Sequence, residues 1–300
     1  MSLRLLLPEE GATELLASWP GEPRVFERGT PSLDATVTAE SIRGYLYTGC
    51  VPAHEIAAVK APSPSLSQNA YMTDGRTDRA KLARLYERGY TIRLGNLQRV
   101  VPALTQISEA IQTETGYSNY IHAFLTPPGG QGLRHHWDQQ MAVIVQIAGT
   151  KRWQLWQPPV EAPMREYNES FRVWKDEYLP AWEAAGPDVE VDLKAGQSLL
   201  LPRGWVHNPR VVAAEEHSIH LTFAIRERTQ LWLAEKLLAG AISRKEFRRI
   251  ILPRQLGGEG LVEQLGEARE ALVKYVQGLD LSEVAPSVIK DALTELEYKT

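Results

Sequence analysis

The chain has 300 residues and a formal net charge of −4 at pH 7, with 43% hydrophobic and 23% charged residues. These values are ordinary for a soluble globular protein with one or two domains. The acidic balance disfavours a generally basic surface, so we do not expect a nucleic-acid-binding protein. Because no stretch approaches the roughly 20 apolar residues that a membrane span needs, we expect no membrane partner.

Cysteine usage and the N-terminal sequence bear on the compartment. The single cysteine, Cys50, excludes an intrachain disulfide and a metal cluster built from cysteines. The apolar run at residues 3–7 is shorter than the roughly 7–15 apolar residues in the core of a signal peptide. Both observations favour a cytoplasmic, reducing location.

The first part of the chain, residues 1–95, mixes short helical signals with loops, and we expect a helix-rich segment that packs on the main domain. Residues 38–45 predict a capped helix, and residues 77–89 predict another that ends at a glycine. A further amphipathic helix is predicted over residues 101–115. Its apolar stripe consists of Leu104, Ile107 and Ile111.

Residues 96–228 form the predicted main domain, in which the pattern changes to β from about Ser118. Strands are expected at 119–125, at the continuous apolar run 141–147, and at 151–156, where polar and apolar residues alternate. Gly149 and Thr150 mark a turn between the last two. A short apolar strand, residues 199–201, is bracketed by Gly196 and by Pro202-Arg203-Gly204.

Three polar residues in this domain predict a metal site. Alternate residues of a strand point to the same side, so His136 and Asp138 are expected to converge while Trp137 faces away. A third candidate, His207, lies 69 residues after Asp138, and a β-barrel can bring so distant a strand beside the first. Two imidazoles and one carboxylate hold Fe(II) on one face and leave positions open for a co-substrate and O2.

Several motifs occur in one order along the chain, and together they are more specific than the short His-x-Asp pattern alone. They are residues 89–94, 125–132, the pair His136 and Asp138, residues 151–153 and residues 217–222. At these positions the sequence resembles the JmjC branch of the cupin superfamily, most closely its ribosomal-oxygenase-like group (cupin-4 type) of protein hydroxylases.

The resemblance implies a fold and an activity. The fold is mainly β with helical flanks: a double-stranded β-helix, or jelly-roll, core followed by a C-terminal helical region. The activity implied is that of a 2-oxoglutarate-dependent dioxygenase. It binds Fe(II) and takes 2-oxoglutarate as co-substrate, whose decarboxylation drives hydroxylation of a substrate C–H bond.

A dicarboxylate co-substrate needs a cation, and Lys151 stands where the resembling family carries a basic residue. The alternative for Lys151 is an ordinary surface lysine at a strand end. Ser218, His220 and Thr222 share one face of a predicted strand, and we favour Ser218 among them for hydrogen bonds to the same keto acid. Weaker candidates are Asn119 and Tyr120, followed by Thr126.

Other residues near the predicted site have two interpretations each. His135 is expected on the face opposite Asp138, and so as a neighbour of the site or a surface group rather than a ligand. His122 and His220 are core histidines or hydrogen-bond donors to ligands. His54 and His217 are predicted at the surface. The aromatic-rich segment 160–188 is either a lid over the substrate or packing against the barrel.

The last part, residues 229–300, predicts helices with three apolar stripes. By family resemblance this region mediates homodimerisation; alternatively it shields a barrel edge. A basic cluster within it is explained better by a solvated helix face than by a partner surface for RNA or an acidic protein. The cluster consists of Arg244, Lys245, Arg248, Arg249 and Arg254.

The chain also departs from the family pattern. Gln139, Met141 and Gln197 stand where the resembling group often carries acidic residues. These changes spare the predicted metal ligands, but they lie near where substrate specificity is set, so the family's substrates do not carry over. The tail is also short for a dimerisation region followed by a full winged-helix domain.

Three functions are compatible with this sequence. The leading hypothesis is a hydroxylase of a protein, peptide or amino-acid-like substrate. The second is a non-catalytic, metal-binding cupin that serves as a sensor or partner-binding module. The third is a cupin isomerase or dioxygenase that uses no keto acid, for which Lys151 would be irrelevant.

Overall fold

The computed structural model divides the chain into two compact units, Met1–Arg226 and Glu227–Thr300, and each is described by itself. The described residues are 2–29, 32–63, 65–164, 173–213 and 216–295. Within these ranges, no helix combines the length and the apolar character that a bilayer crossing requires.

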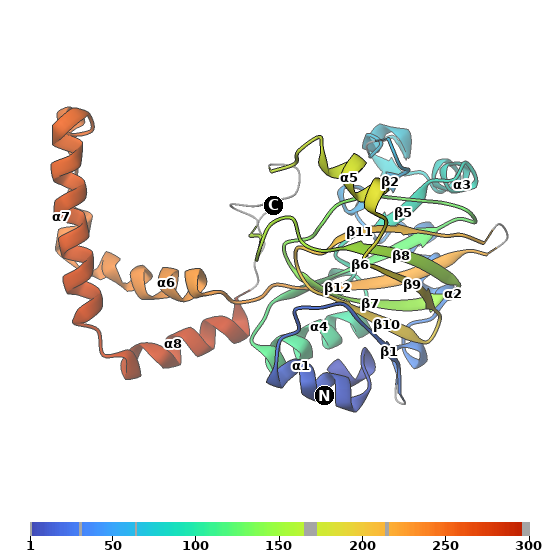
Figure 1. The fold of residues 1–300 in the computed structure, drawn as a ribbon, viewed down its shortest axis with the longest axis horizontal. Helices are drawn as coiled ribbons and strands as arrows, with labels where there is room; N and C mark the ends of the chain where they lie inside the picture. The colour runs from blue at the N-terminus through green and yellow to red at the C-terminus, as the bar shows by residue number, and fades with distance from the viewer. Residues whose placement is uncertain (1, 30–31, 64, 165–172, 214–215, 296–300) are drawn as a thin grey trace. The chain divides into compact units, whose positions relative to one another are not determined.

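The first unit is built on an antiparallel sheet of seven strands in the order β1-β10-β7-β12-β6-β5-β2 (Figure 1). In that order the strands are Arg24–Glu27, Gln197–Leu201, Met141–Ala148, Ser218–Ile225, Asn119–Thr126, Thr91–Leu94 and Ile56–Val59. A second sheet has the order β11-β8-β9, with strands Val206–Arg210, Thr150–Trp156 and Val189–Lys194. A small hairpin joins β3 (Met72–Thr73) and β4 (Arg76–Thr77).

The two larger sheets pack face to face and bury side chains between them. Ala142 and Ile144 of β7 form one apolar cluster with Trp153 and Leu155 of β8 and with Leu193 of β9. Two antiparallel sheets packed in this way make the double-stranded β-helix core, so the predicted fold, mainly β with helical flanks, is confirmed.

Helices cover the other face of the seven-stranded sheet (Figure 1). The helices of the first unit are α1 (Glu9–Ala17), α2 (Ala39–Thr48), α3 (Arg79–Glu87), α4 (Pro102–Thr115) and α5 (Tyr178–Ala185). The predicted stripe of α4, Leu104, Ile107 and Ile111, is buried in one core cluster with Val143 of β7 and Phe223 of β12. Alternation along β7 and β12 therefore sends one set of side chains to this helical core and the other set between the sheets.

Local sequence signals explain where several elements begin and end. Thr38 caps α2, because its hydroxyl accepts from the Ser41 backbone N–H and Ser41 accepts in return from the Thr38 N–H. Gly116 ends α4 in the left-handed region at φ +72°. At Gly149, in the predicted turn before β8, a Cβ would lie 2.0 Å from the His217 carbonyl oxygen. Only glycine fits there.

The structure differs from the sequence-based expectation in two places. β1, β2 and β5 come from the first 95 residues and join the central sheet, so this part supplies sheet strands in addition to the helices that were predicted there. His136 and Asp138 lie in the connection between β6 and β7, where only isolated bridges at Gln131 and His136 are strand-like. The predicted strands at 119–125, 141–147, 151–156 and 199–201 are confirmed by β6, β7, β8 and β10.

The second unit consists of α6 (Gln230–Ala239), α7 (Gly258–Gln277) and α8 (Leu281–Thr294) with short 3-10 turns between them. Among its described hydrophobic residues, only Ala241 is fully buried. Large apolar side chains are exposed instead, including Ile250 at 86% and Val262 at 71%. The basic cluster at residues 244–254 is mostly exposed as well.

Candidate functional site

Two of the predicted metal ligands, His136 and His207, are hydrogen-bonded to each other through their backbones. The His207 N–H donates to the His136 carbonyl at 2.8 Å, and the His136 N–H donates to the His207 carbonyl at 3.3 Å. This pair of bonds fastens the connection between β6 and β7 to β11. Asp138 is held nearby, since its carbonyl accepts from the Gly204 N–H at 2.8 Å.

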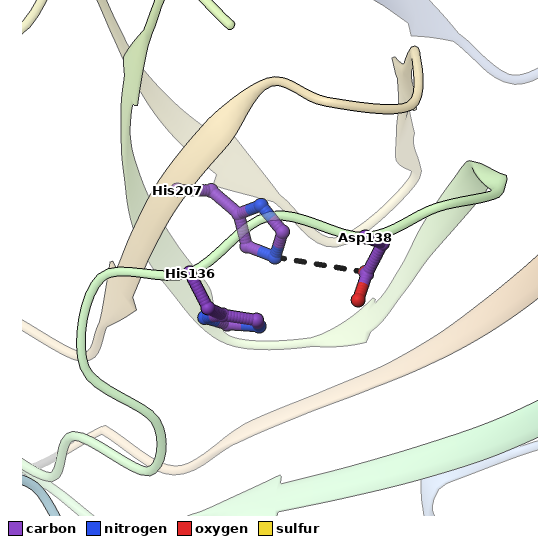
Figure 2. Close-up of side chains that lie close together, drawn as sticks. All are labelled: His136, Asp138 and His207. Carbon is purple, nitrogen blue, oxygen red and sulfur yellow. Dashed lines mark ion pairs between the residues drawn. The ribbon is translucent and has the colours of Figure 1, made fainter. Parts of the chain in front are cut away.

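The three predicted side chains converge, as Figure 2 shows. One potential ligand atom from each of His136, Asp138 and His207 lies within 4.8 Å of the other two. The His207 Nε2 atom is 3.8 Å from the Asp138 Oδ2 atom. The prediction that a distant imidazole would meet the His136 and Asp138 pair therefore agrees with the geometry.

The hydrogen bonds of the two imidazoles favour metal binding through Nε2. His136 Nδ1 is 2.7 Å from the Arg134 carbonyl, and His207 Nδ1 is 3.0 Å from the Trp205 carbonyl. A carbonyl only accepts, so each Nδ1 carries the proton and each Nε2 presents a lone pair. Burial and the neighbouring His136 lower the pKa of His207 to about 4, so this imidazole is neutral at pH 7, as a ligand must be.

This donor set fits ferrous iron. Imidazole nitrogens with one carboxylate oxygen on a single face are the arrangement that non-haem Fe(II) uses, with the opposite positions open. The Asp138 side chain is 46% exposed while that of His207 is 5% exposed. The site is therefore anchored on the barrel side and accessible on the other.

A cavity of about 200 Å³ lies beside the three ligands, between the two sheets. The seven-stranded sheet contributes side chains from β5, β6, β7, β10 and β12, and the three-stranded sheet from β8 and β11. The lining polar and charged residues are Thr91, Arg93, Tyr120, His122, His136, Asp138, Lys151, His207, His220 and Thr222.

Lys151 lies inside this cavity, not at the surface. Its side chain is buried, and the Nζ atom donates to the Thr126 hydroxyl at 3.0 Å. Burial lowers the pKa of Lys151 to about 7 because no carboxylate compensates for the lost water. The surface interpretation of Lys151 is wrong, and the position suits a ligand that brings negative charge.

Of the other candidate contacts to a keto acid, some line the cavity and others make hydrogen bonds elsewhere. Thr222 lines the cavity, as does His220 on the same strand face. The Ser218 hydroxyl is buried and accepts from the Gln146 amide at 2.8 Å. The Asn119 amide donates to the Ser108 carbonyl in α4 at 2.9 Å, so its donor is directed to the helical side of the sheet. Thr126, the weakest of the predicted candidates, accepts the hydrogen bond from Lys151.

Three of the remaining histidines, His122, His135 and His220, are buried or half-buried. His122 and His220 are enclosed, and burial lowers the pKa of both, that of His122 to about 3. His135 is buried away from the triad, where its Nε2 is 3.4 Å from the Asn208 amide and its ring contacts Trp156 and Trp182. The expectation that His135 is no ligand agrees with this position.

The aromatic-rich segment packs beside the metal-binding loop. The rings of Trp174, Tyr178 and Trp182 contact one another, and Trp137 stacks on Trp174 at 6.2 Å between centroids. Tyr167 and Phe171 lie outside the described residues. The described part favours packing through Trp137, and closure over a substrate stays a prediction.

Sequence reasoning ranked Thr126 last and did not single out Arg93 as a site residue. The signal for Thr126 was present, because it shares strand parity with Tyr120, His122 and Phe124, three residues that line the cavity. Arg93 shares its parity with Thr91 in the same way. What the sequence lacks is the pairing of β5 with β6 that carries Arg93 toward the cavity.

Comparison with known proteins agrees with this fold. Residues 93–233 match the family model described as the JmjC domain. This match covers a little under half of the chain, and the expected resemblance to the JmjC branch of the cupin superfamily is confirmed.

Relatives of known name point to the ribosomal-oxygenase-like group within that branch. The chain is 28% identical over 225 residues to a "bifunctional lysine-specific demethylase and histidyl-hydroxylase NO66" of Drosophila yakuba, covering 72% of this chain and 32% of the relative. It is 30% identical over 203 residues to "ribosomal oxygenase 1" of Danio rerio, covering 65% and 36%. The chain spans about a third of the length of these relatives.

Among solved structures, the chain is similar to YcfD, a ribosomal oxygenase from Escherichia coli, in its complex with cobalt and 2-oxoglutarate. The TM-score is 0.56 at 13% identity, with 98% of this chain and 73% of that chain covered. At this identity the likeness concerns the fold.

Proposed function

We propose that this protein is an Fe(II)- and 2-oxoglutarate-dependent oxygenase that hydroxylates a C–H bond of a protein, peptide or amino-acid-like substrate. The observation that carries the proposal is one cavity that holds both the His136, Asp138 and His207 triad and the buried Lys151. A metal site alone would not explain why Lys151 is buried in the same cavity without an acidic partner of its own among the described residues. A dicarboxylate co-substrate explains it.

Each residue has a distinct task in this proposal. His136, Asp138 and His207 would hold the iron. Together with 2-oxoglutarate and O2, bound iron supplies the oxidising power that inserts one oxygen atom into a C–H bond while the keto acid becomes succinate and CO2. Lys151 receives the distal carboxylate of the keto acid by a charge-assisted hydrogen bond, with the Thr126 hydroxyl beside it. Trp153 and Phe124 exclude water from this end.

Relatives support a macromolecular substrate. The named activities of the relatives are histidyl hydroxylation, lysine demethylation and ribosomal oxygenation. We extend from them the class of reaction and the general class of substrate, but no particular substrate protein or residue, because this chain departs from the family pattern at Gln139 and Met141. A protein or peptide side chain is the favoured substrate, and an amino-acid-like small molecule is the alternative.

The decisive test is anaerobic reconstitution with Fe(II), followed by 2-oxoglutarate and O2, with succinate as the readout. We expect succinate even without substrate, at a low uncoupled rate, and we expect it to vanish in His136→Ala. Tight iron binding without any succinate, with or without candidate peptides, would instead favour the non-catalytic cupin. Succinate formation that is indifferent to Lys151→Ala would show that Lys151 does not anchor the keto acid.

The second unit supports a further part of the proposal, a homodimer. Helices α6, α7 and α8 expose many large apolar side chains, among them Leu231, Val262 and Ile289, more than a soluble surface normally leaves uncovered. A second copy of the same unit would cover them. Light scattering should give a dimer for the full chain and a larger monomer fraction for Val262→Asp. Gln277→Asp, an equal charge change at an exposed position of α7, should remain dimeric.

Location and nucleic-acid contacts complete the proposal. The single free cysteine, Cys50, is exposed, which suits a reducing cytoplasm where ferrous iron also persists. The basic cluster of the second unit is assigned to solvated surface, so no nucleic acid is required for activity. Cell fractionation followed by detection of the chain tests the location.

A further inference from the structure

The cavity extends past the metal triad to residues that the proposed reaction does not use. Along β6 the cavity-facing side chains run from Phe124, near Lys151, to His122 and Tyr120. An extended strand advances about 3.3 Å per residue, so Tyr120 and Phe124 are separated by about 13 Å. Phe124 marks the keto-acid end of the cavity, and Tyr120 and His122 mark what we term the substrate end.

Arg93 lines the cavity from the neighbouring strand β5, where its backbone pairs with Phe124, and its charge acts on His122 at the substrate end. Its Nε atom is buried and has no hydrogen-bond partner among the described residues. A guanidinium N–H that has lost water without gaining an acceptor is costly. Arg93 is therefore a donor prepared for an acceptor that the folded chain does not supply.

Three charged residues act on the pKa of His122. Burial lowers this pKa most, Arg93 and Arg226 lower it further and Asp138 raises it; the pKa is about 3, so the imidazole is neutral at pH 7. Arg226 lies over the Tyr120 ring, with its guanidinium carbon 5.1 Å from the centroid. Asp138 is the only acidic side chain among the described residues that line the cavity, and it belongs to the metal triad.

We propose that Arg93 binds a carboxylate of the substrate, so that the substrate presents an acidic side chain rather than a cationic one. This inference rests on the proposed function, because it assumes that the substrate enters beside the triad. The guanidinium fork matches a carboxylate with two parallel hydrogen bonds and keeps its charge at every physiological pH. A lysine or arginine side chain would meet the Arg93 cation here and, apart from the metal ligand Asp138, no carboxylate among the described residues that line the cavity.

The test measures binding to the full-length protein loaded with Mn(II) and 2-oxoglutarate in the absence of O2. Three blocked alanine pentapeptides, with glutamate, glutamine or arginine at the centre, are titrated by calorimetry. The glutamate peptide is expected to bind roughly tenfold or more tightly than the glutamine peptide, because a charge-assisted pair replaces a neutral one. The arginine peptide should bind most weakly.

Substitutions assign that preference to Arg93. Arg93→Gln should raise the Kd of the glutamate peptide about tenfold and leave that of the glutamine peptide within about twofold. Arg93→Lys keeps the charge but not the fork, and should give an intermediate Kd. Arg84→Gln, the same charge change at an exposed site on α3, should leave every Kd unchanged. Thermal melting of each variant checks that it is folded.

The outcomes separate this inference from the proposed function. Equal binding of the glutamate and glutamine peptides to the unsubstituted protein overturns the inference, as does an unchanged glutamate Kd in folded Arg93→Gln. The wild-type comparison decides even if that variant does not fold. Binding of 2-oxoglutarate alone is measured in the same instrument. If it is tight while the peptide preference is absent, only the Arg93 assignment fails; if it is absent, the proposed function fails.

Discussion

The keto-acid end and the substrate end of the cavity each present one cation, and the two cations differ in what they can do. Lys151 is 2% exposed and has a pKa lowered by burial to about 7, so it is partly neutral in the free protein at that pH. Arg93 is less buried, and a guanidinium does not lose its proton in a protein.

The difference shows how one sign of charge serves two purposes. A carboxylate that reaches Lys151 also draws a proton to it, so that binding and charge arrive together. A carboxylate that reaches Arg93 meets a charge that is already there. A lysine that gains its charge on binding, as at Lys151, suits a co-substrate that must be enclosed. A permanent charge, as at Arg93, suits the selection of a substrate by its charge. The following experiments strengthen or refute this contrast.

Loss of a metal ligand should reduce succinate formation more than any other change, because the reaction at both ends of the cavity depends on the metal between them. Asp138→Ala is expected to reduce succinate formation by at least about 1,000-fold, since the carboxylate closes the ligand set. His135→Ala removes an imidazole that is turned away from the triad and should keep most of the activity. If Asp138→Ala still formed succinate, the triad would not hold the catalytic metal, and the different roles of Lys151 and Arg93 on either side of it would not bear on catalysis.

Lys151→Met tests the keto-acid end and should weaken 2-oxoglutarate binding by about 10- to 100-fold, the usual worth of a charged hydrogen bond. The same change should raise the melting temperature of the free protein, because it removes an uncompensated buried ammonium. The folded pKa of Lys151 lies below its unfolded value of 10.5, so the unfolded chain binds more protons between about pH 7 and 10.5. Wild-type stability should therefore rise across that window, and this contribution should be missing in Lys151→Met.

The pH dependence of 2-oxoglutarate binding should distinguish the two cations directly. Above pH 7 the free protein carries neutral Lys151, so binding must take up a proton, and the Kd should rise by up to about tenfold per pH unit. Below pH 7 the contribution of Lys151 should be flat. Calorimetry in buffers of different ionisation enthalpy measures the proton uptake. A Kd that is constant from pH 7 to 9 would contradict the role given to Lys151.

Thr126→Val should have the smallest effect, raising the Kd for 2-oxoglutarate about three- to tenfold through the loss of one neutral hydrogen bond. Thr222→Val is the matched comparison, because Thr222 lines the same cavity from β12. If Thr222→Val had the larger effect, the distal carboxylate would lie nearer β12 than Lys151 and Thr126 indicate.

Much of this site follows from sequence because strand parity and residue chemistry are local. The apolar run at 141–147 and the alternation at 151–156 locate β7 and β8, and Lys151 follows from the family resemblance, which places a basic residue there. The ligand set follows from its chemistry, although His136 and Asp138 turned out to lie in a connection and not on a strand. There the backbone bonds to His207, not strand parity, bring the ligands together.

Contacts that depend on pairing between distant segments could not be predicted. Thr126 meets Lys151 only because β6 and β8 belong to sheets that face each other. Arg93 reaches the cavity only because residues before 95 join the central sheet through β5. Neither relation leaves a periodic signal in the sequence, since both are set by register and sheet packing.

The reciprocal backbone bonds between His136 and His207 have a consequence for how metal is acquired. Two of the three ligands are tethered to each other by the chain itself, so an arriving ion need not gather them from a disordered loop. We therefore expect folding and metal loading to be separate events. A chelator should remove the ion and leave an intact scaffold that can be refilled, in contrast to small domains that fold only around their ion.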